Sequence, residues 1–432
     1  MHRRLVSLRS LLAALGVLAL ARAAEPAVSQ PAPSLPNGSN PPASLEDRLR
    51  ALESKVDGLQ KENAELRRAL GAPPVAAPHS GGATEAHVTV DPVLPAGKET
   101  KLFIGGYTQA QAEFGGTGDA RFVGTNDRFY FRRARINVAG NFAEHFEFKV
   151  EGEFGAGSVT AGTGLRASMN DTYLGWNRYP EATVRIGQLK PAFASELLTQ
   201  EYKGALIERS LGADRLGDSR QIGLGVAGDF FSARAGYQIF VGNGNGANSS
   251  ANDNNKFLQT ARAYAVAFDA GDAGRLTLGA DALHSTDTAL SKSGPGFDSV
   301  PGGVLDNLFT GTRDGWGVDA VWHLNLFDLS TELLRVRYRP VNATPARSFD
   351  AESWQVSASY FLVPHYFQAA VRREHFDPNT GRSGDATNNW LVGLDYYFKG
   401  EDLKLMVDYL FGHAAGLPDN HGRLLTRFQI VY

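Results

Sequence analysis

The sequence predicts an all-β fold, a 16-stranded antiparallel transmembrane β-barrel, preceded by an α-helical coiled-coil segment. Three observations carry this prediction: alternating apolar and polar residues from 101 to 432, turns that are alternately tight and long, and an export signal. In Phe146–Glu151 every second side chain is apolar, so the two kinds lie on opposite faces of a strand. A soluble β-sandwich alternates too, so the strand number and the loop asymmetry decide between them.

The first 23 residues have the composition of a secretory signal peptide. Three arginines precede the apolar run Leu11–Leu20, and Ala21 and Ala23 supply small residues before a cleavage site. The run is shorter than the roughly 20 residues of a membrane-spanning helix, so cleavage is favoured over a retained anchor. The chain contains no cysteine, which excludes disulfides, thiolate catalysis and cysteine metal sites.

Residues 24–100 divide into three segments by composition. Residues 24–43 form a proline-rich tether, and residues 71–100 form a linker rich in Pro, Gly and Ala. Between them, residues 44–70 repeat Leu and Val at spacings of four and three, which is typical of a coiled coil. Asn63 occupies a core position and is expected to fix the register of the helices. A single amphipathic helix on another surface is the alternative.

Residues 101–432 contain about sixteen stretches of strand pattern, joined by turns that alternate between tight and long. Outer-membrane barrels combine short periplasmic turns with longer external loops, and aromatic residues such as Tyr396–Phe398 gather at the tight turns. We therefore expect a location in the outer membrane of a Gram-negative-type bacterium, with both barrel ends and the coiled coil on the periplasmic side.

Motifs for other functions are weak. The glycine pattern Gly223–Gly228 matches a dinucleotide fingerprint, but a strand pattern follows it where a helix is required, so we interpret it as a bend in the sheet. None of the 10 histidines lies in a zinc-protease motif. We expect no enzyme activity, no cofactor, no metal and no nucleic-acid partner. Since a catalytic triad is assembled in space, a barrel hydrolase stays open as a minor alternative.

Candidate residues for an anion pathway are basic side chains predicted to face the lumen. Arg133 and Arg135 share one face of their strand, and the same parity places Lys149 inside. Arg335 and Arg337 also share a face, although a β-bulge is needed to turn them inward. The long segment 191–220 is expected to fold into the pore, and with the residue before it contributes Lys190, Lys203, Arg209, Arg215 and Arg220. The alternative is that these cations pair with lumen carboxylates.

Five motifs make the sequence similar to the phosphate-selective porin O and P family: Phe131–Ile136, Phe146–Lys149, Asp171–Leu174, Ile186–Phe193 and Ile207–Leu211. The resemblance implies a trimeric sixteen-stranded outer-membrane channel, in which lumen arginines and constriction lysines bind phosphate or polyphosphate. The chain differs from that pattern in the balanced charge of segment 191–220 and in an excess of acidic over basic groups, 46 against 43.

The sequence therefore predicts an outer-membrane porin for small solutes that favours inorganic anions such as phosphate. The alternatives are a weakly selective general porin and a structural tether between membrane and cell wall. The expected partners are a homotrimer, outer-membrane lipid, the barrel assembly machinery and, through the coiled coil, the cell wall. Phe428, Ile430 and Tyr432 alternate in the last strand and are expected to form its insertion signal.

Overall fold

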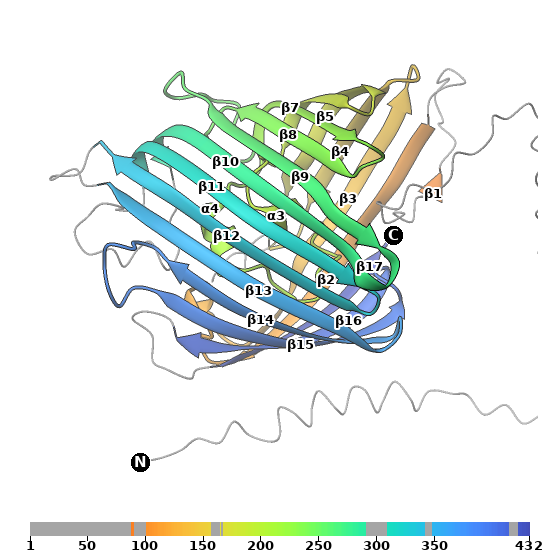
Figure 1. The fold of residues 1–432 in the computed structure, drawn as a ribbon, viewed down its shortest axis with the longest axis vertical. Coiled ribbons are helices and arrows are strands. Elements are labelled where there is room, and N and C mark those ends of the chain that lie inside the picture. The colour runs from red at the N-terminus through yellow and green to blue at the C-terminus, as the bar shows by residue number, and fades with distance from the viewer. Residues whose placement is uncertain are drawn as a thin grey trace, which may run out of the picture. The chain divides into compact units, whose positions relative to one another are not determined.

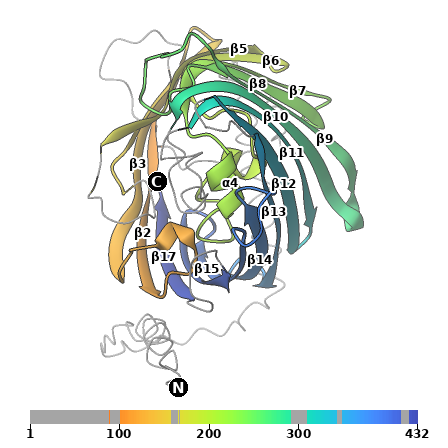
Figure 2. The same cartoon turned by 90° about the vertical axis from the view of Figure 1, so that its left-hand side faces the viewer.

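The computed structural model describes residues 88–89, 101–156, 165, 167–290, 309–341, 348–413 and 422–432. The signal segment, the tether and the predicted coiled coil with Asn63 lie outside the described residues. Sixteen strands form a closed barrel, seen from the side in Figure 1 and turned by 90° in Figure 2. They are β2 (Lys101–Gly115), β3 (Arg128–Phe142), β4 (Phe146–Glu153), β5 (Ser168–Tyr179), β6 (Ala182–Leu189), β7 (Gln221–Phe230), β8 (Ala235–Gly242), β9 (Leu258–Ala270), β10 (Gly274–Leu290), β11 (Phe309–Leu324), β12 (Phe327–Pro340), β13 (Phe349–Val363), β14 (Phe367–Asp377), β15 (Thr387–Lys399), β16 (Leu403–His413) and β17 (Arg423–Val431).

Each strand pairs antiparallel with the next, and β17 pairs with β2 to close the barrel. The short strand β1 (Val88–Thr89) pairs with β2 at Phe103 and Ile104, below the point where β17 ends. At the closure the backbones of Gly106 and Tyr432 exchange two hydrogen bonds, of 2.7 and 2.9 Å. The predicted sixteen-stranded antiparallel barrel is confirmed.

The wall of the barrel is uneven in height. Strands β4, β6 and β8 have 8 residues each, whereas β10 and β11 have 17 and 16. Tight turns at one end use left-handed backbone, as at Ala143 and Glu144 with φ of 46° and 58°. The predicted glycine motif lies inside β7, where a Cβ on Gly223 would approach the Val241 carbonyl oxygen to 2.2 Å. Close packing against β8 therefore requires glycine at that position.

The two faces of the wall differ as period-two strands require. Ile136, Leu174 and Val392 are exposed on the outer face, while Gln109, Gln111 and Glu113 are buried on the inner face of β2. Two short helices interrupt the segment between β6 and β7, α3 (Ser195–Leu198) and α4 (Leu211–Leu216). No described helix is long and apolar enough to span a membrane. Among the described residues, no group of three or more His, Asp or Glu side chains could hold a metal ion.

Candidate functional site: the constricted lumen

The segment that joins β6 to β7, residues 190–220, folds into the barrel and is called here the inner loop. Figure 2 shows its helix α4 inside the ring of strands, and α4 contacts β12, β13 and β14. The sequence of α4 explains its start, because Ser210 is the N-cap residue and its hydroxyl accepts from the Ala213 amide at 3.3 Å. The inner loop narrows the lumen, as an infolded loop does in a wide barrel.

Apolar side chains hold the inner loop against the wall at two places. Phe193, Leu211 and Leu216 belong to a buried cluster with Leu334 and Val336 of β12. Leu206 and Ile207 belong to a second cluster with side chains of β15, β16 and β17. Burial of these side chains removes apolar surface from water, at about 25 cal/mol per Å². Parts of the inner wall are thus apolar because they contact the loop and are not in water.

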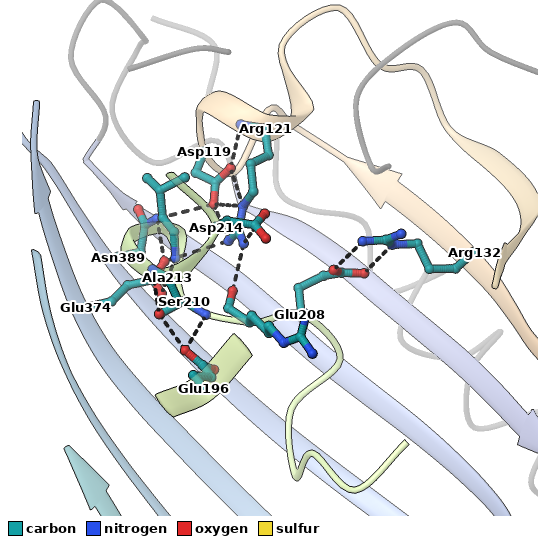
Figure 3. Close-up of polar contacts among 12 residues, drawn as sticks. Asp119, Arg121, Arg132, Glu196, Glu208, Ser210, Ala213, Asp214, Glu374 and Asn389 are labelled. Atoms are coloured by element: carbon teal, nitrogen blue, oxygen red, sulfur yellow. Dashed lines mark hydrogen bonds and ion pairs between the residues drawn. The ribbon is translucent and has the colours of Figure 1, made fainter. Parts of the chain in front are cut away.

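Charged groups fasten the same loop, as Figure 3 shows. Arg121 of the first external loop binds Asp119 through two nitrogens and donates to the Arg209 carbonyl oxygen at 2.7 Å. It also lies 3.7 Å from Glu374 of β14, which accepts from the Leu211 amide at 3.2 Å. A second link joins the Arg372 guanidinium of β14 to Glu196 at 2.5 Å. Two loops and the wall therefore form one connected network.

Glu208 of the inner loop binds guanidinium groups that point inward from two strands of the wall. It accepts from Arg132 of β3 at 3.0 Å and from Arg427 of β17 at 2.6 Å. Arg427 also donates to the Ile207 carbonyl oxygen. Burial alone would raise the pKa of Glu208, but Arg132 and Arg427 outweigh it and hold that pKa well below its usual range. Glu208 is therefore an anion that neutralises some of the charge of this basic wall.

Glu201 has the same role nearer the tight-turn end of β3. Its carboxylate lies 3.0 Å from Arg135, 3.1 Å from Arg209 and 3.6 Å from Lys190. Burial would raise the pKa of Glu201, yet Arg135 and its neighbours hold it well below the usual value. Burial lowers the pKa of Lys190 to about 7 against the opposing effect of Glu201. Lys190 is thus a cation of the inner loop that gains or loses its charge near neutral pH.

Arg133 differs from the other arginines of this region. Its side chain is only 6% exposed and donates to Gln109 Oε1 at 2.8 Å, but among the described residues it makes no ion pair. It lines a cavity of about 410 Å³, which is bounded also by Lys203, Arg209 and Arg372. Lys203 makes no ion pair within the described part of the chain either, and its nitrogen lies 6.0 Å from the centre of the Tyr202 ring. Arg133 and Lys203 are thus lining cations without an ion pair among the described residues, although the carboxylates of Glu196, Glu201 and Glu208 line the same cavity.

Carboxyl groups of β10, β11 and β12 lie at the same cavity. Asp319 of β11 and Glu332 of β12 line it, and Asp281 of β10 lies nearby. A single guanidinium, Arg262, binds Asp281 at 2.8 Å and Asp319 at 2.6 Å. Glu332 accepts from the Ser195 amide at 2.5 Å and has no ion pair among the described residues. The cavity is therefore lined by both basic and acidic side chains.

The remaining candidates of the inner region are Lys149, Arg215 and Arg220. Lys149 pairs with Glu151 at 3.1 Å, and Arg220 pairs with Asp171 at 2.6 Å. Lys149 also lies 3.9 Å from Asp171, so one carboxylate joins the two cations. Arg215 is half-buried on α4. The expectation that lumen cations pair with lumen carboxylates describes Lys149, Arg135 and Arg220, but not Arg133.

The prediction for Arg335 and Arg337 was wrong. Strand β12 pairs with β11 and β13 without a register shift, so the bulge that would turn these side chains inward does not exist. Leu334 and Val336 take the inner face because they pack against the inner loop, which leaves both arginines on the outer face. There they bind Asp350 of β13, each at 2.7 Å.

The sequence reasoning missed several lumen arginines: Arg121, Arg132, Arg313, Arg372, Arg423 and Arg427. Arg132 turns inward because β3 contains a bulge, where Gln109 and Ala110 pair with Arg133 and Phe131. A signal for it is present in the sequence, since the apolar residues change parity between Phe131 and Ala134. Arg121 lies in the loop between β2 and β3 and carries no strand signal. The other four share parity with polar neighbours on β11, β14 and β17, and period-two reasoning applied to every strand would have found them.

Comparison with known proteins identifies related sequences and folds. The model of the family described as "Phosphate-selective porin O and P" matches residues 105–416. A search of curated proteins finds no match.

Three solved structures illustrate the shared fold. A loop-deletion form of OmpT, an outer membrane protein of Vibrio cholerae, is 12% identical, with a TM-score of 0.55 over 78% of this chain and 100% of that chain. The anion-selective porin from Comamonas acidovorans is 10% identical, with a TM-score of 0.53 over 77% and 100%. The outer membrane channel DcaP of Acinetobacter baumannii is 13% identical, with a TM-score of 0.52 over 78% and 99%. At these identities the likeness shows the fold.

Proposed function

Because this chain belongs to the phosphate-selective porin O and P family, we propose that it is an outer-membrane porin that favours inorganic anions such as phosphate or polyphosphate. The family and the barrel are those of an outer-membrane channel rather than an enzyme. Arg133 carries the proposal on anions, because it is a lumen guanidinium without an ion pair among the described residues, beside Lys203 at the constriction. A guanidinium in a confined channel replaces some of the hydration shell of an anion.

A change at Arg133 tests this proposal directly. Arg133→Gln keeps a hydrogen bond to Gln109 within reach but removes the charge, so the ratio of anion to cation permeability should fall by about twofold or more. The measurement is the zero-current potential in a planar bilayer under a salt gradient. Phosphate block of the chloride current should weaken in the same variant.

Arg337→Gln is the matched control, since it removes a guanidinium from the outer face of the barrel. It should leave the zero-current potential unchanged. Equal potentials for wild type and Arg133→Gln would refute the role of Arg133. Absence of stable conductance steps in the wild type would favour the membrane-to-wall tether over a channel.

A weakly selective general porin is the second candidate, and the compensation of most lumen charges favours it. Glu201 and Glu208 each neutralise several cations, and Asp319 and Glu332 add carboxyl groups to the lining of the same cavity. The two candidates differ in one measurement: phosphate should block the chloride current of an anion-selective channel at lower concentrations than sulfate does, and equally poor block would identify a general porin.

We also propose a homotrimer, with the low wall of the barrel at the subunit contacts. The outer faces of β3 and β5 carry apolar side chains with large exposed fractions, 80% for Phe129 and 59% for Leu174. A trimer form is described for OmpT of Vibrio cholerae, whose fold is similar. Light scattering of the detergent-solubilised protein should give three chains per particle. Phe129→Ser with Leu174→Ser should release monomers, because the contact loses apolar area.

A further inference from the structure

Charged side chains on the outer face of the barrel are concentrated in one sector, toward the long-loop ends of β11, β12 and β13. Six residues define this outer charged patch: Asp314, Arg335, Arg337, Arg339, Asp350 and Glu352. Elsewhere the described outward positions are mainly apolar, for example Ile136 on β3, Leu224 on β7 and Val392 on β15. A charge on the lipid face is costly at the midplane of a membrane and almost free near its surface. The patch therefore requires a polar environment at its height.

Register places the six residues next to one another across three strands. Arg337 lies opposite Asp314 on one side and Asp350 on the other. Asp350 binds Arg335 and Arg337 at 2.7 Å each, and Arg335 also binds Glu352 at 3.3 Å. Arg339 binds Asp314. The arginines remain open to the outside, with side chains that are 38%, 54% and 48% exposed for Arg335, Arg337 and Arg339. Each guanidinium has five N–H groups, and these bonds use at most two of them.

The height of the patch follows from strand geometry. Phe327 begins β12 at the tight-turn end, where Tyr360 and Phe398 are exposed aromatic residues of the periplasmic girdle. Arg337 lies about ten residues further along, which at about 3.4 Å per residue and a tilt of about 40° is a rise of about 26 Å. The apolar band of such barrels is about 25 Å tall. Trp316 lies directly opposite Arg335, and Trp354 lies two register positions closer to the tight-turn end, where interfacial tryptophans are expected. The guanidinium groups are thus level with the headgroups of the outer leaflet.

We propose that the outer charged patch binds the phosphate groups of a phosphorylated glycolipid in the outer leaflet. Two oxygens of a phosphate group accept two parallel N–H bonds from one guanidinium, and alternate residues on one face of β12 present three such groups in a row. This inference is independent of which solute passes through the channel.

A second copy of the chain fits the patch less well than lipid does. Subunit contact would remove six charges from water, and the cost of desolvation then opposes the gain from pairing. The apolar residues Phe129 and Leu174 on β3 and β5 offer a contact without that cost, and β4 and β12 are eight strands apart, on opposite sides of a sixteen-stranded ring. The patch therefore faces away from the wall that we propose for the trimer.

Binding of lipid A that carries both phosphates to the full-length protein in detergent tests the proposal, with native mass spectrometry as the measurement. The triple variant Arg335→Gln, Arg337→Gln, Arg339→Gln should bind at least about tenfold more weakly than wild type. Dephosphorylated lipid A should bind to wild type as weakly as lipid A binds to the triple variant. The matched control is Arg178→Gln with Arg234→Gln, which removes exposed arginines next to tight turns and should leave binding unchanged.

A second variant, which should increase the affinity for lipid A, keeps the test decisive if the triple variant folds poorly. Asp314→Asn, Asp350→Asn, Glu352→Gln removes the carboxylates that compete with phosphate, so it should bind lipid A more tightly than wild type. Equal affinity of wild type and both variants would overturn the proposal, as would binding that does not depend on the lipid phosphates. Inorganic phosphate as competitor should have little effect, because it lacks the acyl chains, whereas complete competition would assign the patch to free anions. Dissociation of the oligomer in the triple variant would assign it to a subunit contact.

Discussion

Within the inner loop, Lys190 is the residue whose charge we expect to respond most to pH. Burial lowers its pKa to about 7, so the side chain is neutral at pH 8.5 and charged at pH 5.5. Protonation adds one positive charge 3.6 Å from Glu201, at the constriction. We expect anion preference to rise as the pH falls through 7, measured as a shift of the zero-current potential between pH 8.5 and 5.5.

Lys190→Gln isolates this effect from the other groups that titrate in the lumen, such as His323. The variant should keep the zero-current potential of the pH 8.5 wild type and lose most of the shift at pH 5.5. An identical shift in wild type and variant would assign the pH response to other groups.

Among the elements of the fold, the inner loop depends on the network around Arg121. Arg121→Ala leaves Asp119 buried without its cation and leaves Glu374 with Arg372 alone, and removal of one partner from a buried pair costs about 3–5 kcal/mol. The loop should detach partially from the wall, which raises single-channel conductance and adds current noise. Arg234→Gln, an exposed change at a tight turn, should alter neither quantity. A quiet channel of unchanged conductance in Arg121→Ala would show that the apolar contacts hold the loop by themselves.

The last strand, β17, closes the barrel against β2 and contains the residues of the predicted insertion signal. Phe428, Ile430 and Tyr432 all face outward, and Tyr432 exchanges two backbone hydrogen bonds with Gly106. Its hydroxyl also donates to the Arg135 carbonyl oxygen at 3.1 Å. Deletion of Tyr432 should therefore lower the yield of folded, heat-modifiable protein in the outer membrane, measured by gel mobility. Tyr432→Phe keeps the ring and the backbone bonds and should retain most of that yield.

For the whole molecule, the N-terminal heptads predict that a coiled coil preceding the barrel helps to hold the chains of the oligomer together. The segment 44–70 should associate as a parallel trimer in which Asn63 keeps the helices in register. Asn63→Leu should strengthen association of the isolated segment and broaden its choice of oligomer, as analytical ultracentrifugation would show. A monomeric segment at high micromolar concentration would contradict this prediction and leave the barrel wall to hold the trimer.

Local physics explains why much of the architecture could be predicted from the sequence. Period-two alternation places Ile136 and Val138 on the face opposite Arg135, and turn residues separate the strands without reference to the rest of the chain. The number of strands and the alternation of tight and long connections follow from the same local signals, and both agree with the structure.

The charge of the lumen was decided by contacts between residues far apart in sequence. Arg135 is neutralised by Glu201 of the inner loop, 66 positions away, while Arg133 two residues earlier is not. Parity correctly separates faces along one strand, but it cannot say which face is the lumen. On β12 the side chains of Leu334 and Val336 pack against the inner loop. Arg335 and Arg337 alternate with them and therefore point to the outside. The sequence by itself determined the barrel and its strand rhythm, since these depend on neighbouring residues. The tertiary structure decided which charges remain free in the lumen, because an infolded loop supplies both the carboxylates that neutralise them and the apolar surface that reverses a face.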